Sequence, residues 1–251
     1  MDCKVTEKLA TFAVHYLNYV GLMNKLPTVT KNLLIINVLA WMGTLALGKY
    51  GIDLHRLFGL HFFLAPSFKI WQLITYMFLH EGFQHIFFNM FAVWMFGRIM
   101  EETWGAKRFL FFYLLCGIGA GVMQEICQFV HYEIAFAQYE QVSMGGYIVP
   151  MKTYLDGILT VGASGAVYGI LLGYGMTFPD NQLFIIPFPF PIKAKWLVIG
   201  YVVLELGLGL RASAADNVAH FAHLGGMLVG FLIILYWKHK DRKDNHIDFT
   251  W

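Results

Sequence analysis

The stretch GILTVGASGAVYGILLGYGM, residues 157–176, is apolar along its length and reaches the roughly 20 residues that a helix needs to cross a bilayer. It nevertheless contains a serine, Ser164, flanked by small residues. A second apolar stretch, residues 217–237, contains His223 near its start. Polar and ionisable groups inside lipid are costly and usually functional. Ser164 and His223 are therefore candidates for a nucleophile and its base.

The composition of the whole chain also indicates a membrane protein. Of its 251 residues, 58% are hydrophobic, 17% are aromatic and only 14% are charged, and the mean hydropathy is +0.56. Soluble domains carry about 25% charged residues, so an ordinary soluble domain is excluded. The net charge of +2 is small, and membrane topology explains the basic residues. We therefore expect contact with a lipid bilayer and no binding to nucleic acid.

Six segments are candidate spans, so we predict an all-α bundle of six transmembrane helices. The segments are residues 32–47, 83–100, 109–130, 157–176, 196–210 and 217–237. The first and fifth are short for a hydrocarbon core about 30 Å thick, so either their true ends extend into the flanking residues or they lie where the bilayer is thinner. The membrane domain is assigned to residues 31–238. It is preceded by an amphipathic segment, residues 1–30, and followed by a basic tail, residues 239–251.

The distribution of Lys and Arg predicts the orientation of this bundle. With six spans, 13 of these residues fall on the face that carries both termini and 5 fall on the other face. Basic residues accumulate on the cytoplasmic side of membranes. Both termini, the amphipathic segment and the basic tail are therefore expected in the cytoplasm.

The candidate serine and histidine are expected to lie at one depth. Ser164 is about seven residues into its segment and His223 about six into its own, and both segments are expected to run inward from the outer face. At about 1.5 Å per residue, each would lie roughly 10 Å below that face. They are therefore placed to meet.

A further pair of polar residues, His85 and Asn89, lies at the outer end of the segment 83–100. The two are four residues apart and therefore share one helix face. A tetrahedral oxyanion needs preorganised donors, and the His85 ring, the Asn89 amide and the Ser164 backbone N–H are candidates.

Glycines accompany both catalytic candidates, namely Gly162, Gly165 and Gly169 in one segment and Gly226 and Gly230 in the other. Small residues allow helices to approach closely. Such spacing also occurs in ordinary packing, and a lone serine in a helix often bonds the backbone one turn back. Catalysis is favoured by the coincidence of serine, histidine and the His/Asn pair at one depth.

These residues together resemble a known family. The motifs are Gly162-Ala163-Ser164-Gly165 with Tyr168, Ala222-His223 with Gly226 and Gly230, and His85 with Asn89. They resemble those of the rhomboid family of intramembrane serine proteases. The resemblance spans roughly residues 71–230 and includes Gly97, Glu101, Gly105 and Arg108, which look like the family's connection between its second and third core helices.

The resemblance implies a Ser-His dyad without a third member. Ser164 would be the nucleophile and His223 the general base and then acid, with His85 and Asn89 around the oxyanion. It further implies that Tyr168 packs on the histidine ring. Substrates would be membrane proteins, cut in or beside a transmembrane helix. Six spans with short tails look most like a prokaryotic plasma-membrane rhomboid whose active site opens to the outer face.

Three positions near the motifs qualify this comparison. Glu101 matches an acidic residue that family members use structurally. Trp71-Gln72 replaces a Trp-Arg pair that is frequent in the family, so a role that needs that arginine is not transferred. His220 lies one turn before His223 and is a competing base, but only His223 has the glycine spacing of the family.

Neither a metal nor a cofactor is expected. No His-Glu-x-x-His motif is present, and His220 and His223 lack an obvious acidic third ligand at their depth. Activity is expected to fall as His223 becomes protonated at low pH.

Two alternatives to a protease stay open at this point. A catalytically silent rhomboid-like protein would bind membrane-protein clients, although such relatives typically lack the serine or the histidine. A transporter with a polar pocket has less support. It explains an intramembrane histidine and asparagine, but not a glycine-flanked serine that faces them.

Overall fold

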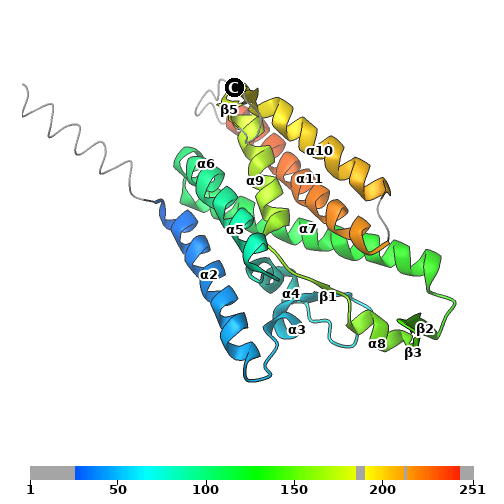
Figure 1. Cartoon of the computed structure of the whole chain (residues 1–251). Coiled ribbons are helices and arrows are strands. Elements are labelled where there is room, and N and C mark those ends of the chain that lie inside the picture. The colour runs from blue at the N-terminus through cyan, green and yellow to red at the C-terminus, as the bar shows by residue number, and fades with distance from the viewer. Residues whose placement is uncertain (1–25, 185–189, 212–213, 244–251) are drawn as a thin grey trace, which may run out of the picture.

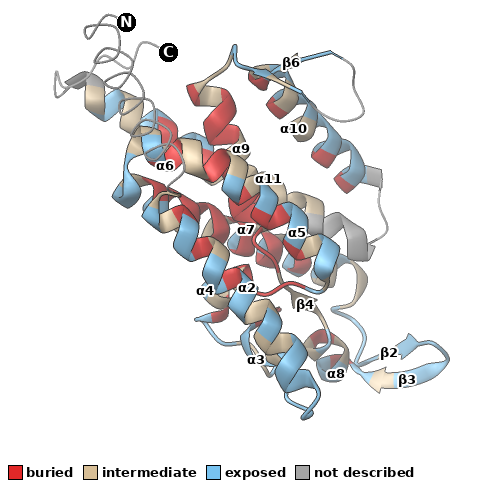
Figure 2. Ribbon diagram, turned by 60° about the vertical axis from the view of Figure 1, so that its left-hand side comes forward, coloured by how far each residue is buried: buried red, intermediate tan, exposed pale blue. Residues whose placement is uncertain are grey.

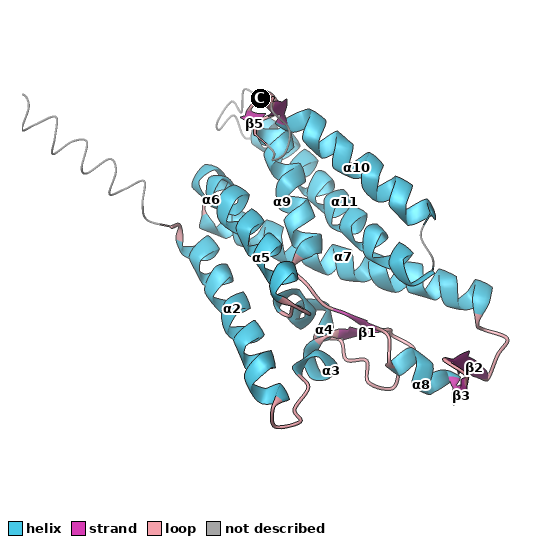
Figure 3. Ribbon diagram, in the orientation of Figure 1, coloured by secondary structure: helices cyan, strands magenta, loops and turns pink. Residues whose placement is uncertain are grey.

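The computed structural model describes residues 26–184, 190–211 and 214–243. These parts of the chain are mostly helical, with three small two-stranded sheets (Figure 3). Nearly all of the predicted amphipathic segment, residues 1–30, lies outside the described residues, and so does the basic tail from residue 244 onward.

Six helical segments correspond to the six predicted spans in the described residues. They are α2 (Thr28–Gly48), α5 (Phe83–Ala92) with its continuations η2 (Val93–Gly97) and α6 (Arg98–Trp104), α7 (Ala106–Ala135), α9 (Ser164–Thr177), α10 (Ala194–Arg211) and α11 (Ala214–Lys243). Where the structure describes the chain, three helices are long and apolar enough to cross a membrane, namely Thr28–Gly48, Ala106–Ala135 and the His220–Asp241 part of α11. The number of crossings and the side of the termini remain predictions.

Helix α9 occupies the centre of the bundle, with α7, α10 and α11 beside it and α5 across from them (Figure 1). Figure 2 shows that α9 is largely buried whereas α2 is largely exposed. Small residues permit this central position. A Cβ built on Gly169 would lie 2.6 Å from Cβ and Sγ of Cys116 in α7, so only a glycine fits there.

The outer surface of the bundle is strongly apolar. Large hydrophobic side chains are exposed along α2, α5 and α10, among them Ile35, Ile36, Leu39, Met42, Phe83, Phe87, Phe88, Phe91, Trp196, Ile199, Val203 and Leu204. Soluble monomers rarely expose continuous apolar patches of this extent, whereas a lipid-facing surface requires them.

The start of α2 is held by a carboxylate from another helix. Glu101 of α6 is buried and accepts hydrogen bonds from the backbone N–H of Val29 (2.9 Å) and Thr30 (2.7 Å). It also accepts one from the Thr30 hydroxyl, at 2.8 Å. The first N–H groups of a helix have no partner within it, so Glu101 caps α2 from outside.

The predicted span 157–176 is wrong in its first part. Residues 157–163 are not helical, because β4 (Leu159–Thr160) pairs with β1 (Leu60–His61). The backbone then turns at Gly162, whose φ of 129° is rarely adopted by residues with a side chain. Ser164 is thus the first residue of α9, and the estimate that it lies seven residues into a helix does not hold.

Short elements link the long helices. In the described residues they are α3 (Leu54–Phe58), α4 (Gln72–Thr75), η1 (Tyr76–Phe78), β2 (Gln141–Met144), β3 (Tyr147–Pro150), α8 (Met151–Asp156), β5 (Gln182–Leu183) and β6 (Ile192–Lys193). Strands β2 and β3 form a hairpin through Gly145 and Gly146, both with positive φ. Gln72, which stands where the family often has arginine, is buried, and its amide accepts from the backbone N–H of Lys69 at 3.0 Å.

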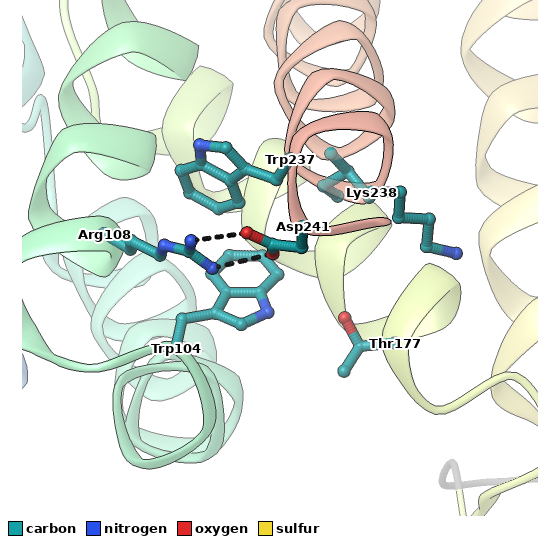
Figure 4. Close-up of a pocket in the computed structure, with 7 residues that line it drawn as sticks. Trp104, Arg108, Thr177, Trp237, Lys238 and Asp241 are labelled. Carbon is teal, nitrogen blue, oxygen red and sulfur yellow. Dashed lines mark hydrogen bonds and ion pairs between the residues drawn. The ribbon is translucent and has the colours of Figure 1, made fainter. Parts of the chain in front are cut away.

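At the end of the bundle opposite Ser164, an ion pair joins α7 to α11 (Figure 4). The Arg108 guanidinium donates to both carboxylate oxygens of Asp241, at 3.1 and 2.9 Å. Arg108 also lies 5.4 Å from the ring centre of Trp237, which packs edge-on against Trp104. Bidentate pairs of this kind fix geometry as well as adding energy.

Candidate active site

Two helices far apart in the sequence bring Ser164 and His223 together. Ser164 begins α9, and His223 lies in the first half of α11. The Ser164 Oγ is 2.9 Å from the His223 Nε2, which is hydrogen-bond distance. Both side chains are partly exposed, so a reactant is able to reach them. This is the geometry in which an imidazole takes a proton from a hydroxyl.

Glycines make this approach possible. Gly165 and Gly226 meet where α9 crosses α11, with no side chain between their backbones. Gly230 lies one turn further along α11, against Phe112 of α7. Backbone-to-backbone packing of this kind requires small residues at the crossing. Gly165 and Gly226 therefore lie at the helix crossing beside Ser164 and His223, whereas Gly162 lies in the turn before α9.

Tyr168 supports the His223 ring. The two rings are stacked, with centroids 4.2 Å apart and planes 12° apart. Tyr168 lies one turn after Ser164 on α9, so the same helix supplies the hydroxyl and the surface on which the imidazole rests. The Tyr168 ring also packs edge-on against the ring of Tyr201 in α10.

His85 lies against the backbone just before Ser164. A Cβ built on Gly162 would be 2.6 Å from the His85 Nε2 and 3.8 Å from the Ser164 Oγ. The His85 ring nitrogen and the Ser164 hydroxyl thus both lie close to the Gly162 backbone, and the His85 ring fits there only because residue 162 has no side chain. Asn89 lies one turn further along α5 and is buried. Their role as oxyanion donors stays a prediction.

A second histidine supports His85. His80, in the loop before α5, is fully buried, and its ring packs edge-on against that of His85 with centroids 4.9 Å apart. Burial and the neighbouring His85 lower the pKa of His80 to about 3. His80 is therefore a neutral packing partner at pH 7.

Glu205 of α10 is a site residue that the sequence reasoning missed. It is only 3% exposed, and its Oε2 lies 3.2 Å from the His223 Nδ1 and 2.6 Å from the His220 Nδ1. Its Oε1 accepts a hydrogen bond from the Tyr168 hydroxyl. The available signal was an isolated carboxylate inside the apolar segment 196–210, since such groups are usually functional in membranes.

The structure therefore differs from two expectations. The resemblance implied no third residue beside the dyad, yet Glu205 lies against His223 on the side away from Ser164. His220 and His223 were also expected to lack an acidic neighbour, and Glu205 contacts both. The reason is that Glu205 comes from a different helix, whose rotation about its own axis is set by packing rather than by local sequence.

The same three residues form a group that is able to hold a metal ion. Ligand atoms of Glu205, His220 and His223 all lie within 4.8 Å of one another. Imidazole nitrogen and carboxylate oxygen are the ligands that zinc prefers. In this structure the Glu205 carboxylate already forms hydrogen bonds with both histidine rings, so its charge is compensated without a metal ion.

Comparison with known proteins identifies the family. A family model described as the rhomboid domain matches residues 67–240. The chain belongs to the rhomboid family. The resemblance drawn from the serine and histidine motifs is thereby confirmed, and together with the apolar helices it makes this rhomboid an integral membrane protein.

Curated relatives include proteins named as rhomboid proteases. Rhomboid protease GluP of Bacillus subtilis is 31% identical over 163 residues, which are 64% of this chain and 25% of that protein. Rhomboid protease AarA of Providencia stuartii is 29% identical over 202 residues, 75% and 65% of the two chains. RHOMBOID-like protein 6 of Arabidopsis thaliana, a mitochondrial protein, is 26% identical over 163 residues, 65% and 42% of the two chains. The chain thus matches between 25% and 65% of the length of these relatives.

Proposed function

We propose that this rhomboid-family protein is an intramembrane serine protease that hydrolyses peptide bonds in or beside transmembrane helices of other membrane proteins. The observation that carries the proposal is the 2.9 Å separation between the Ser164 Oγ and the His223 Nε2. Membership of a family that includes proteins named as proteases supports it.

The proposed reaction proceeds through an acyl-enzyme. His223 accepts the Ser164 proton through Nε2 while Oγ attacks the substrate carbonyl carbon. His223 then donates that proton to the leaving amine, and the peptide bond breaks. His223 then takes a proton from a water molecule while the water oxygen attacks the acyl carbon. The bond from that carbon to the Ser164 Oγ breaks, and His223 returns the proton to Oγ.

The negative oxygen formed during attack needs donors close to Ser164. The His85 ring and the Ser164 hydroxyl both lie close to the Gly162 backbone, so the His85 N–H is the proposed side-chain donor to an oxyanion formed at Ser164. Ser164 is the first residue of α9, so its backbone N–H has no acceptor within the helix. Asn89 is assigned as a further donor from α5.

Substrates of such a site must expose a carbonyl. In a transmembrane helix each carbonyl accepts a backbone hydrogen bond, so the segment has to unwind before Ser164 can attack. Segments with glycine, proline or small polar residues are therefore the preferred substrates. The distribution of basic residues, 13 against 5, supports cytoplasmic termini and a site near the outer face of a prokaryotic plasma membrane.

The test is cleavage of a fluorescently labelled transmembrane substrate by the purified protein in detergent. Ser164→Ala and His223→Ala should each abolish cleavage. Ser164→Ala should also abolish labelling of the protein by a fluorophosphonate. The matched controls are Ser143→Ala, in the exposed β2, and His239→Ala, at the exposed far end of α11. A wild type that neither cleaves several substrates nor reacts with the fluorophosphonate would contradict the proposal and favour a client-binding protein.

A further inference from the structure

We propose that Glu205 is a positioning residue for His223, which makes the active site a Ser164–His223–Glu205 chain rather than a dyad. Glu205 holds the His223 ring in the tautomer that leaves Nε2 free to accept the serine proton. The inference rests on the proposed protease function and adds a residue to it.

The hydrogen-bond inventory of the cluster fixes the direction of each bond. A carboxylate has only acceptors, and Glu205 is approached by three groups that are able to donate, namely the Tyr168 hydroxyl and the Nδ1 atoms of His220 and His223. The His223 Nδ1 must therefore carry its proton. Its Nε2 then has a lone pair, which faces the Ser164 hydroxyl at 2.9 Å.

The contacts place the His223 ring between its acidic partner and the serine. Glu205 of α10 and Ser164 of α9 lie on the two opposite nitrogens of the His223 ring, which belongs to α11. When His223 takes the serine proton it becomes a cation, and the carboxylate at 3.2 Å offsets that charge. Among the side chains that the structure describes, no other carboxylate lies within ion-pair distance of His223.

Glu205 is buried, and its charge is compensated by hydrogen-bond donors from neighbouring helices. The side chain is only 3% exposed in an otherwise apolar helix, where an isolated charge is expensive. Three donors compensate that charge. Tyr168 both stacks on the His223 ring and donates to Glu205, so one residue constrains the imidazole and its acidic partner together.

A purely structural role is the competing explanation. Glu205 links α9, α10 and α11 through its three partners, and such a link would stabilise the bundle whether or not it affects His223. The two roles differ in their consequences. A structural link affects the melting temperature, whereas a positioning residue also affects kcat and the location of the ring proton.

The test compares Glu205→Gln and Glu205→Asp with wild type and with Gly207→Ala, a control on the same helix whose added methyl group meets no atom within 4 Å. Glu205→Gln keeps the shape of the side chain and removes its charge. We expect it to lower kcat at least about tenfold with KM changed less than about threefold, because the carboxylate acts in the transition state. Glu205→Asp should retain part of this rate, since the carboxylate remains.

The location of the proton is measured independently of catalysis. In ¹⁵N-histidine spectra, with His223 assigned by its loss in His223→Gln, the wild-type ring should be protonated at Nδ1 and unprotonated at Nε2. Glu205→Gln should give a mixture of tautomers. If this variant fails to fold, Glu205→Asp and Tyr168→Phe provide the same comparison, because each weakens the cluster while the other bonds persist.

The outcomes separate this inference from the proposed function. An active wild type with Glu205→Gln at full kcat, or with a lower melting temperature but an unchanged His223 tautomer, would overturn the positioning role and leave the protease intact. A wild type without activity would overturn the proposed function. The tautomer comparison would then still decide whether Glu205 controls the His223 ring.

Discussion

The backbone of Gly226 lies directly against the carbonyl oxygen of Gly165. A Cβ built on Gly226 would lie 2.1 Å from that oxygen, whereas real Cβ atoms essentially never come within 3.0 Å of a non-bonded heavy atom. Gly165 follows Ser164, and Gly226 lies one turn after His223. The distance between the two helix backbones at this point therefore sets the distance between hydroxyl and imidazole.

Gly226→Ala should accordingly impair the site without changing any reactive group. The methyl group has to push α11 away from α9, which lengthens the Ser164–His223 contact beyond hydrogen-bond range. We expect cleavage and fluorophosphonate labelling to fall at least about tenfold. Gly200→Ala, whose Cβ meets nothing within 4 Å, is the matched control. Equal labelling rates in the two variants would show that the crossing does not control the site.

Gly162→Ala tests the backbone turn that leads into Ser164. The φ of 129° is strained for alanine, by roughly 1–3 kcal/mol, and the methyl group would also lie 2.6 Å from the His85 Nε2. We expect loss of cleavage with a smaller loss of melting temperature, because the methyl group displaces the ring of His85, the proposed oxyanion donor. Gly82→Ala is the control, since its extended backbone suits any residue and its Cβ meets no atom within 4 Å. Wild-type kcat in Gly162→Ala would contradict this assignment.

Glu101→Gln should destabilise the protein rather than alter its chemistry. It replaces the charged acceptor that caps α2 through Val29 and Thr30, at a cost of roughly 1–3 kcal/mol. Thermal unfolding in detergent measures the change. Glu102→Gln removes only an exposed pair with Arg98 and should shift stability by less than about 0.5 kcal/mol. Similar melting temperatures for the two variants would argue against the cap.

Added zinc should reversibly inhibit the proposed cleavage. A zinc ion bound by Glu205, His220 and His223 would occupy the proposed general base, because all three ligand atoms lie within 4.8 Å. A chelator should restore the rate and should leave metal-free enzyme unaffected. His220→Gln removes one of the three ligands, so the zinc concentration for half inhibition, relative to that variant's own rate, should rise at least about tenfold. Inhibition unaffected by His220→Gln would place the zinc elsewhere.

The segment around α8 should loosen in acid. Burial alone would raise the pKa of Asp156, but hydrogen bonds from the Ser67 hydroxyl and backbone N–H outweigh it and hold the pKa below its ordinary value. A lowered folded-state pKa stabilises the fold above the unfolded-state pKa, and that contribution is lost as the pH falls through the folded-state value. The protection factors of the α8 amides, which take account of the intrinsic pH dependence of hydrogen exchange, should therefore fall below about pH 4.

Asp156→Asn provides the comparison for this acid effect. The variant should show faster exchange of α8 already at neutral pH, with little further change on acidification, because its side chain has no charge to lose. Arg56→Gln, which removes only an exposed pair with Asp156 at 3.7 Å, should behave like wild type. An equal acid response in Asp156→Asn would assign the loosening to another group.

The sequence by itself determined which segments are apolar enough to form membrane helices and which polar residues are unusual within them. Apolar segments of sufficient length and the cost of polar groups in lipid singled out Ser164, His223, His85 and Asn89. The motif glycines identified the rhomboid family, which the domain match confirmed. These features are local: each depends on hydropathy, spacing and residue size within one segment.

Only the tertiary structure decided how these segments combine. The strand pairing of β4 with β1 ended the helix before Ser164, although residues 157–163 are as apolar as those that follow. The contact of Glu205 with His223 depends on the rotation of α10 about its axis, and the cap of α2 depends on Glu101, 71 residues away from Thr30. Hydropathy leaves such choices open, because the packing of several helices at once determines which polar groups meet.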